Sequence, residues 1–460
     1  MTALNFAIKN IATCARNTWA TGIIGIFLAF SQGLALAAIP VQHWTQASGA
    51  QVYLVESPAI AMLDVQIDFD AGSRRDPPGQ AGLASMMAGM LDKGVRATDG
   101  APALDENTLS EAWADLGAQF GASAGSDRLG FSLRSLTDPA LLDQAVALAA
   151  REIAEPAFPE AVWQRERQRV QAALKESYTR PGNVAGRAYA QAVYGSHPYG
   201  YETTADSLAR IGVADLRALH AASVVACRAR ISLVGAVTRQ QADALAARLL
   251  ARLPQVACAG LPPLPAVAEV APLAAPLEKR IPFDAAQAQV LIGQPGFKRS
   301  DPDYFALTVG NYILGGGGFV SRLSSEVREK RGLTYGVSSS FSPGLHAGSF
   351  TVSLQTRPDQ AAQSVELVRQ LVKDFVANGP TEAELKAAKD NLVGGFALRI
   401  DSNRKLLDNV AGIAWNQLPL DYLDTWTQQV NRVTVADIKA AFARKLQPEK
   451  MVTVILGAAP

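Results

Sequence analysis

The sequence VADL at residues 213–216, followed by the apolar stretch ISLVG at residues 231–235, decides the architecture because it occurs twice. The second copy is VADI at residues 435–438, followed by TVILG at residues 453–457. In both copies the first valine and the last glycine are 22 positions apart, and the second copy begins 222 positions after the first. A motif that recurs at a fixed offset indicates a repeated structural unit. We therefore expect two copies of one unit.

The same offset aligns the Glu-Ala pairs at residues 160–161 and 382–383, each of which opens a long helical pattern after a proline. Each half combines period-2 stretches typical of strands with period-3.6 stretches typical of helices. In the second half we expect strands over residues 333–340 and 349–355, followed by three helices. Elements grouped in this order predict an α+β fold with two homologous duplicated domains, each a mainly antiparallel sheet packed against helices.

The domain boundaries follow from length and composition. A chain of 460 residues fits two domains better than one core. Residues 258–276 contain five prolines and a single charge, Glu269, which predicts an extended, semi-rigid linker. We therefore assign residues 38–257 to the first domain and residues 277–460 to the second.

The composition is that of a globular chain, with 48% apolar residues, 18% charged residues and a net charge of +1. Nucleic-acid-binding proteins concentrate Lys and Arg on one face, and no basic segment of that kind occurs in this sequence. We therefore expect no nucleic-acid partner.

Residues 1–37 are predicted to be a secretory signal peptide. Basic residues without any acid precede an apolar stretch at residues 22–30, and Ala-Leu-Ala at residues 35–37 has the small-x-small form that signal peptidase accepts. The alternative is an uncleaved membrane anchor, but Ser-Gln-Gly at residues 31–33 interrupts a stretch already short for a membrane span. We expect cleavage, export to the periplasm and no membrane attachment of the mature chain.

Two cysteines remain after such processing, Cys227 and Cys258. Export makes a disulfide chemically permissible. Residues 229–234 predict a strand and residues 239–253 a helix that returns alongside it, which brings the two cysteines near one another. A Cys227–Cys258 bridge and two separate buried thiols are both compatible with the sequence.

A glycine-rich segment, ILGGGGFVSRL at residues 313–323, continues into VREKRGLTY at residues 327–335. A phosphate-binding loop needs Lys and Ser or Thr directly after the glycines, and Phe-Val stands there instead. The segment resembles the second-domain signature of the insulinase/pitrilysin family of zinc metallopeptidases, which includes mitochondrial processing peptidase. The resemblance extends over the chain that follows the signal peptide, and it implies a clamshell-like arrangement of the two domains.

The resemblance implies that two residues of the second domain, Arg328 and Tyr335, belong to an active site. A guanidinium and a phenol are donors suited to a peptide carbonyl and to the oxyanion that it becomes. Gly332 is expected to end the helix that carries Arg328, so that Tyr335 begins a strand and both side chains reach one cleft. The structural alternative is a surface Arg328 paired with Glu326 or Glu329, together with a half-buried strand tyrosine.

The zinc motif that the resemblance implies is degenerate. Active members of the family carry H-x-x-E-H on an early helix, where two His bind zinc and the Glu activates water. The matching positions here are Ser85, Ala88 and Gly89, and the third ligand, a Glu on a later helix, falls near Ala172 and Ala173. Because these positions lack the required donors, we expect no zinc and no other cofactor in this chain.

Two further segments carry weaker signals. His197 lies in a turn-rich Gly-Ser-His-Pro loop and is interpreted as structural. Residues 120–126 match the region in which active subunits of the family offer a sheet edge to the peptide, a role that uses backbone hydrogen bonds more than side chains.

A chain with the Arg/Tyr pair and without the zinc motif resembles one member of a two-chain peptidase. In heterodimers of this family, one subunit carries the metal and its partner supplies the pair. We therefore predict the non-zinc-binding subunit of a heterodimeric periplasmic metallopeptidase, inactive alone, with a peptide substrate and with zinc in the partner subunit. The alternative is a catalytically inactive scaffold or peptide-binding protein of the same fold.

Overall fold

The computed structural model describes residues 39–98 and 100–457. The predicted signal peptide, residues 1–37, lies outside the described residues. Within the described part, no helix combines the length and the apolar character needed to cross a bilayer.

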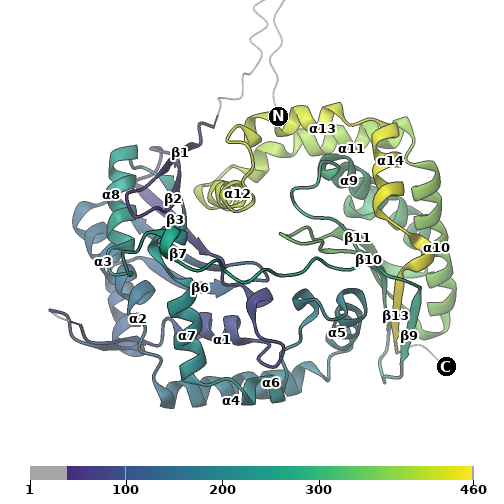
Figure 1. The fold of residues 1–460 in the computed structure, drawn as a ribbon. Helices are drawn as coiled ribbons and strands as arrows, with labels where there is room; N and C mark the ends of the chain where they lie inside the picture. The colour runs from purple at the N-terminus through teal and green to yellow at the C-terminus, as the bar shows by residue number, and fades with distance from the viewer. Residues whose placement is uncertain (1–38, 99, 458–460) are drawn as a thin grey trace, which may run out of the picture. The chain divides into compact units, whose positions relative to one another are not determined.

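The first half of the chain builds a six-stranded sheet in the order β1-β2-β8-β3-β7-β6 (Figure 1). Only β2 and β8 run parallel, and all other neighbours are antiparallel. The strands are β1 Gln42–Thr45, β2 Gln51–Glu56, β3 Met62–Phe69, β6 Gln119–Ala124, β7 Leu129–Leu136 and β8 Arg230–Gly235, and a separate small ribbon consists of β4 Gly94–Val95 and β5 Leu104–Asp105.

The second half builds a five-stranded sheet in the order β11-β12-β10-β13-β9. Its only parallel neighbours are β13 and β9. The strands are β9 Leu277–Ile281, β10 Ala288–Pro295, β11 Thr334–Phe341, β12 Ser349–Thr356 and β13 Val452–Leu456. Read from β9, the strand order of this sheet is β9-β13-β10-β12-β11, with β9 and β13 parallel. The first sheet has the same arrangement in β2-β8-β3-β7-β6, with β2 and β8 parallel. The predicted duplication and the α+β class are therefore confirmed at the level of sheet topology.

Helices cover both sheets. Those of the first half are α1 Leu83–Met90, α2 Glu106–Asp115, α3 Pro139–Ala154, α4 Glu160–Ser177, α5 Pro181–Tyr194, α6 Ala205–Ala209, α7 Val213–Ser223 and α8 Arg239–Leu250. Those of the second half are α9 Tyr304–Asn311, α10 Ala361–Asn378, α11 Glu382–Gly394, α12 Asn403–Asn416, α13 Tyr422–Arg432 and α14 Val435–Lys445, with π-helical turns at Tyr312–Gly316 and Ser324–Glu329.

The prediction of three helices after the last hairpin was wrong, because five α-helices, α10 to α14, follow β12. Two of the additional boundaries are set by capping side chains. The Ser402 hydroxyl accepts a hydrogen bond from the N–H of Lys405, and the Thr434 hydroxyl accepts one from the N–H of Asp437. Such caps satisfy donors that a helix start leaves free, and each therefore begins a new helix.

One helix of each half packs on the sheet of the other half. Helix α5 contacts β10 and β13 of the second sheet, and α12 contacts β2, β3 and β8 of the first (Figure 1). The Tyr189 hydroxyl anchors α5, because it donates to the Phe350 carbonyl oxygen at 2.8 Å and lies 3.0 Å from Thr351 Oγ1. At the other contact, the Arg230 guanidinium lies over the Trp415 ring, 4.8 Å from its centroid.

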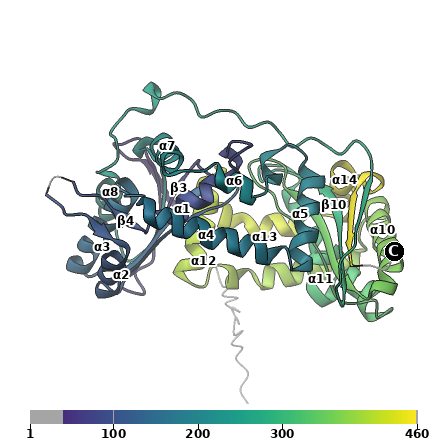
Figure 2. The ribbon, with the colours of Figure 1, turned by 90° about the horizontal axis from the view of Figure 1, so that it is seen from below.

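The segment between the halves has no helix or strand over residues 261–276, and Figure 2 shows it as an extended trace. Cys227 and Cys258 form a disulfide with a Cα–Cα distance of 5.6 Å, so the structure has the bridge rather than two separate thiols. The bridge ties the beginning of this segment to the residues that precede β8. Side chains of both halves contact the middle of the segment: His197 lies against the Ala268 carbonyl oxygen, and Lys298 donates to Glu269.

Candidate functional site

The glycine-rich loop closely approaches strand β11. A Cβ atom on Gly315 would lie 2.5 Å from the backbone nitrogen of Ser339, so this position admits only glycine without a shift of the strand. Gly318 has a φ of +63°, in the left-handed region that favours glycine. The loop then presents Phe319 and Val320 to solvent, with exposed fractions of 67% and 77%.

Arg328 lies in the π-helical turn Ser324–Glu329, and the helix ends before Gly332, whose φ is +62°. Its guanidinium carbon is 4.3 Å from the centroid of the Phe319 ring and 5.5 Å from that of the Tyr335 ring. Cations are attracted to the faces of aromatic rings at such distances. The π-helical turn and the glycine therefore bring Arg328, Phe319 and Tyr335 together.

The neighbouring carboxylate, Glu326, is engaged by other cations. Its oxygens lie 2.6 Å from Lys330 Nζ and 2.7 Å from Arg331 Nη1. The hydrogen bonds from Lys330 and Arg331 lower the pKa of Glu326. Among the ion pairs of residues 39–98 and 100–457, none involves Arg328. The structural alternative, in which Arg328 pairs with Glu326 or Glu329, is therefore not what the structure contains.

Tyr335 lies on β11, an edge strand that pairs only with β12 in the described sheet. The pairing shifts register between Thr334 and Val337, which places Tyr335 and Gly336 in a β-bulge. The Thr334 hydroxyl fixes the bulge, because it lies 2.6 Å from the Gln355 carbonyl oxygen and accepts a hydrogen bond from the N–H of Gly336. The Tyr335 side chain is 86% exposed, not half-buried.

The pair can act on a carbonyl group. Arg328 offers several N–H donors on a rigid plane, and Tyr335 offers one O–H donor. Donors that are held in place before charge develops on an oxygen stabilise that charge without reorganisation. The bulge at Tyr335 was not expected from the sequence, although the Thr-Tyr-Gly tripeptide, with glycine inside a strand, is a local signal for one.

The three positions of the degenerate zinc motif lie on α1. Ser85 and Gly89 are exposed on one face of the helix, four residues apart, and Ala88 is buried. The proposed third position, at Ala172 and Ala173, is exposed on α4. The hydroxyl of Ser85, the hydrogen atom of Gly89 and the methyl groups of the alanines do not provide the nitrogen, sulfur or carboxylate ligands that zinc prefers. The residues at these positions therefore do not fit a zinc ion, and no group of three or more His, Cys, Asp or Glu suited to a metal occurs among the described residues.

The start of α1 is held by a buried carboxylate. Asp76 Oδ2 accepts a hydrogen bond from the N–H of Gly82 at 2.8 Å, and Oδ1 accepts one from Ala84 at 2.9 Å. Burial raises the pKa of Asp76 to about 6, although the hydrogen bonds from the helix N-terminus act in the opposite direction. Asp76 therefore has a structural role in positioning this helix.

His197 is buried in the contact between the halves. Its Nε2 lies 3.0 Å from the Ala268 carbonyl oxygen, and its Nδ1 accepts a hydrogen bond from the N–H of Tyr199 at 3.1 Å. These contacts require the neutral ring with its proton on Nε2. Burial, followed by the neighbouring His346, lowers the pKa of His197. The contacts suit the structural role that the sequence analysis gave to this residue.

Strand β6, Gln119–Ala124, covers most of the segment expected to offer a sheet edge, residues 120–126. It is the last strand of the first sheet and pairs only with β7 in the described structure. Its outer backbone groups are therefore placed where an added strand could pair with them.

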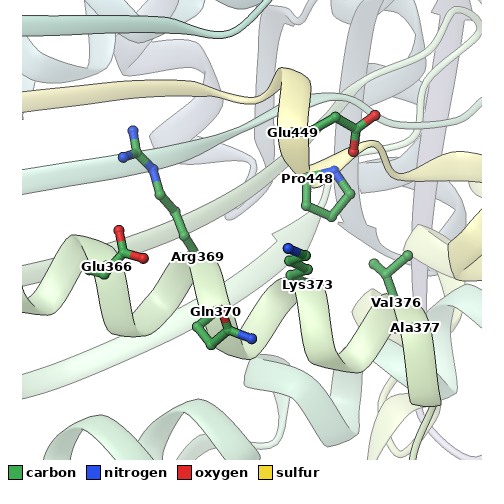
Figure 3. Close-up of a pocket in the computed structure, with 8 residues that line it drawn as sticks. All are labelled: Glu366, Arg369, Gln370, Lys373, Val376, Ala377, Pro448 and Glu449. Carbon is green, nitrogen blue, oxygen red and sulfur yellow. The ribbon is translucent and has the colours of Figure 1, made fainter.

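A separate cavity of about 350 Å³ lies between α10 and the turn that contains Pro448 (Figure 3). One of the two cations that line it, Arg369, already donates to Glu278 and to the Thr453 hydroxyl, both at 2.8 Å. This cavity shares no lining residue with the Arg328/Tyr335 site, and its arginine is occupied by partners within the chain.

Comparisons with known proteins agree with this fold. Residues 51–207 match the family described as Insulinase (Peptidase family M16), and residues 210–392 match the one described as Peptidase M16 inactive domain. A solved structure of a peptidase M16 inactive domain from Pseudomonas fluorescens is 36% identical and superimposes with a TM-score of 0.85, over 91% of this chain and 98% of that one.

Two more distant proteins extend the comparison. The non-peptidase homolog YmxG of Helicobacter pylori is 26% identical over 427 residues, which are 91% of this chain and 93% of the relative. The periplasmic protease PqqL from Escherichia coli shares the fold with a TM-score of 0.76 at 19% identity, over 92% of this chain and 46% of that one. With a 36% identical relative that is matched over nearly its whole length, the chain belongs to the insulinase family, peptidase family M16.

Proposed function

We propose that this chain is the non-zinc-binding subunit of a heterodimeric periplasmic metallopeptidase, and that it supplies Arg328 and Tyr335 to the peptide substrate. The observation that carries the proposal is the pair itself. Arg328 takes part in no ion pair of the described residues, and its guanidinium lies 5.5 Å from the ring of a tyrosine that is 86% exposed. Such an arrangement offers free donors to a ligand.

The two side chains have separate roles in this proposal. Arg328 binds and orients the carbonyl group of the substrate in the ground state, since a guanidinium donates to neutral and charged oxygens alike. Tyr335 donates its hydroxyl proton in a hydrogen bond to the same oxygen as negative charge develops on it. The zinc and the attacking water belong to the partner subunit, because Ser85, Ala88 and Gly89 offer no ligands.

Two observations support the remaining parts of the proposal. The relative named a non-peptidase homolog suits a chain without peptidase activity of its own. The predicted signal peptide, with its basic residues, apolar stretch and small-x-small site, supports export to the periplasm.

The alternative function is a scaffold or peptide-binding protein of the same fold, and the name of the Helicobacter pylori relative is compatible with it. A scaffold has no use for a free arginine beside an exposed tyrosine, so the geometry of the pair favours the peptidase subunit.

The test is kinetic and uses the exported chain together with the zinc-bearing partner that co-purifies with it. Tyr335→Phe removes one hydroxyl and is expected to lower kcat roughly 100- to 1000-fold while folding and partner binding are retained. Arg328→Ala is expected to lower kcat and also to raise KM. The control is Arg331→Ala, because Arg331 contacts only Glu326, through an exposed ion pair and a hydrogen bond to its carbonyl oxygen, and exposed ion pairs contribute little.

If the complex cuts peptides equally well with Tyr335→Phe and with Arg328→Ala, the cross-chain role is wrong and the scaffold function is favoured. The zinc content of the partner should be the same in all three variants, because the metal lies on the other chain.

A further inference from the structure

A cavity of about 390 Å³ opens beside Tyr335. Three neighbouring strands of the second sheet, β10, β12 and β11, form its floor, and α5 of the first half forms one wall. The wall consists of Gly182 and Ala185, which lie three residues apart on one face of the helix. Because these residues are the smallest available, space remains between the helix and the sheet.

Strand alternation brings polar side chains to the floor of the cavity beside one apolar side chain, Leu291. Val290, Leu354 and Val337 point into the core of the second half, so the residues between them face the cavity. Gln289 of β10 lies opposite Gln355 of β12 in the strand register.

The next pair on the same face consists of hydroxyl groups. Ser353 of β12 lies opposite Ser338 of β11, and the two Oγ atoms are 3.3 Å apart. Two amides and two hydroxyls therefore line the floor together with Leu291, and Tyr335 also lines the cavity.

No residue that lines this cavity is charged. In the described part of the chain, the side-chain amides of Gln289 and Gln355 make no hydrogen bond to another residue, and each retains its donors and its acceptor. A charged side chain that entered would lose hydration without meeting a counter-charge among the residues that line the cavity. A side chain with an amide or a hydroxyl would instead find complementary partners.

The position of the cavity relates it to the reacting bond. Side chains of an extended peptide follow one another at about 3.3 Å per residue along the strand. A substrate whose carbonyl oxygen meets Tyr335 therefore brings a side chain adjacent to that carbonyl to the cavity. We infer that the cavity is a specificity pocket that selects an uncharged polar side chain, of the Asn, Gln, Ser or Thr class, next to the scissile bond. This inference rests on the proposed function.

The test is a position-scanning peptide library cut by the complex of this chain with its zinc-bearing partner. The wild-type complex is expected to prefer Gln or Asn over Lys and Glu at one position beside the cut by about tenfold or more in kcat/KM, since sites built to hydrogen-bond a group discriminate strongly. Gln289→Glu has the same shape and adds a carboxylate, so the preference should shift toward Lys and Arg by a similar factor. Ser353→Asp is a second variant with the same expected shift.

The matched control is Ser340→Asp, which adds a carboxylate to the same strand as Ser338 but two residues farther along, where it does not line the cavity. Its side-chain preference should equal that of the wild type. An unchanged preference in both Gln289→Glu and Ser353→Asp would overturn the pocket and leave the proposed function intact.

A binding measurement further distinguishes a failure of the specificity pocket from a failure of the proposed function. If the complex cuts no peptide, the proposed function fails. The pocket is then tested on the isolated chain, by fluorescence anisotropy with two dye-labelled peptides that differ only in having Gln or Lys at one position. The pocket predicts tighter binding of the Gln peptide by the wild type and a reversed order for Gln289→Glu. Equal binding of the two peptides, or no binding of either, contradicts it.

Discussion

At the scale of single residues, the charges around the glycine-rich loop are distributed so that Arg328 has no ion pair among the described residues. Glu326 has two cations, Lys330 and Arg331, within 2.7 Å. A carboxylate with two cationic partners gains little from a third, because exposed ion pairs contribute at most about 1 kcal/mol. Arg328 instead lies against the Phe319 ring, which holds the guanidinium in place without neutralising it.

The absence of zinc ligands leads to a prediction for the purified chain. We expect elemental analysis to find no stoichiometric zinc, because Ser85, Ala88 and Gly89 provide no ligand. The triple variant Ser85→His, Ala88→Glu, Gly89→His is expected to bind zinc weakly, since the third carboxylate is missing at Ala173. Adding Ala173→Glu should tighten binding. Tight zinc binding by the triple variant would show that the position of the third ligand on the later helix was matched to the wrong residue.

Glu152 gives a prediction about pH. It is 1% exposed and accepts a hydrogen bond from Trp113 Nε1 at 2.5 Å. Burial raises its pKa from 4.5 to about 7, so the folded state holds the proton more tightly than the unfolded state. The stability that this provides is fully present below pH 4.5 and is lost as pH rises through 7.

Glu152→Gln stays neutral at every pH and keeps an acceptor for Trp113. The variant should be more stable than the wild type by roughly 3 kcal/mol at pH 8, and by less than about 1 kcal/mol at pH 5. Urea denaturation at the two pH values measures the difference. An equal effect at both would show that Glu152 does not change its protonation between them.

At the scale of elements, two irregularities position the candidate site. The π-helical turn Ser324–Glu329 carries Arg328, and the β-bulge at Tyr335 and Gly336 projects the phenol from the edge of the sheet. π-helical turns and bulges both re-aim side chains relative to a regular helix or strand, and both are common at functional sites.

Two glycines test the role of the backbone at this scale. Gly315→Ala should destabilise the protein by about 1–3 kcal/mol, because its Cβ would lie 2.5 Å from the Ser339 nitrogen. Gly89→Ala should stabilise it by about 0.5–1 kcal/mol, because Gly89 lies within α1 and no atom lies within 4 Å of the added carbon. Urea midpoints of the two variants should therefore move in opposite directions. A higher midpoint for Gly315→Ala would mean that the loop does not approach β11 closely, and a lower one for Gly89→Ala would mean that α1 does not accommodate the added methyl group.

At the scale of the whole molecule, the exchange of α5 and α12 between the halves makes each sheet depend on the other half. The Cys227–Cys258 bridge, with a sequence separation of 31 residues, ties the linker to the first half. In the chain-entropy account, a loop of this size restricts the unfolded chain by roughly 3–4 kcal/mol.

The double variant Cys227→Ala, Cys258→Ala should lose a comparable amount of stability in urea denaturation. Mass spectrometry of the wild type under non-reducing conditions should find both cysteines protected from alkylation. Alkylation of both without reductant would contradict the bridge.

The sequence by itself determined the duplication and the α+β class, because periodicity and a fixed offset of 222 positions are properties of the chain alone. The family followed from the resemblance of the glycine-rich segment and the residues after it to a known signature. It likewise determined that Ser85, Ala88 and Gly89 cannot bind zinc, since a missing donor is visible in the residue type. The pair Arg328 and Tyr335 was predicted from the resemblance of one motif.

Only the tertiary structure decided which partners these residues have. Glu326 could equally have paired with Arg328, and the packing of the loop, not the sequence, gave it Lys330 and Arg331. The cavity depends on α5 lying against β10, elements more than 90 positions apart, and no local pattern encodes such a contact. Local periodicity reports which face of an element is buried, but the element that covers that face is selected by packing over the whole chain.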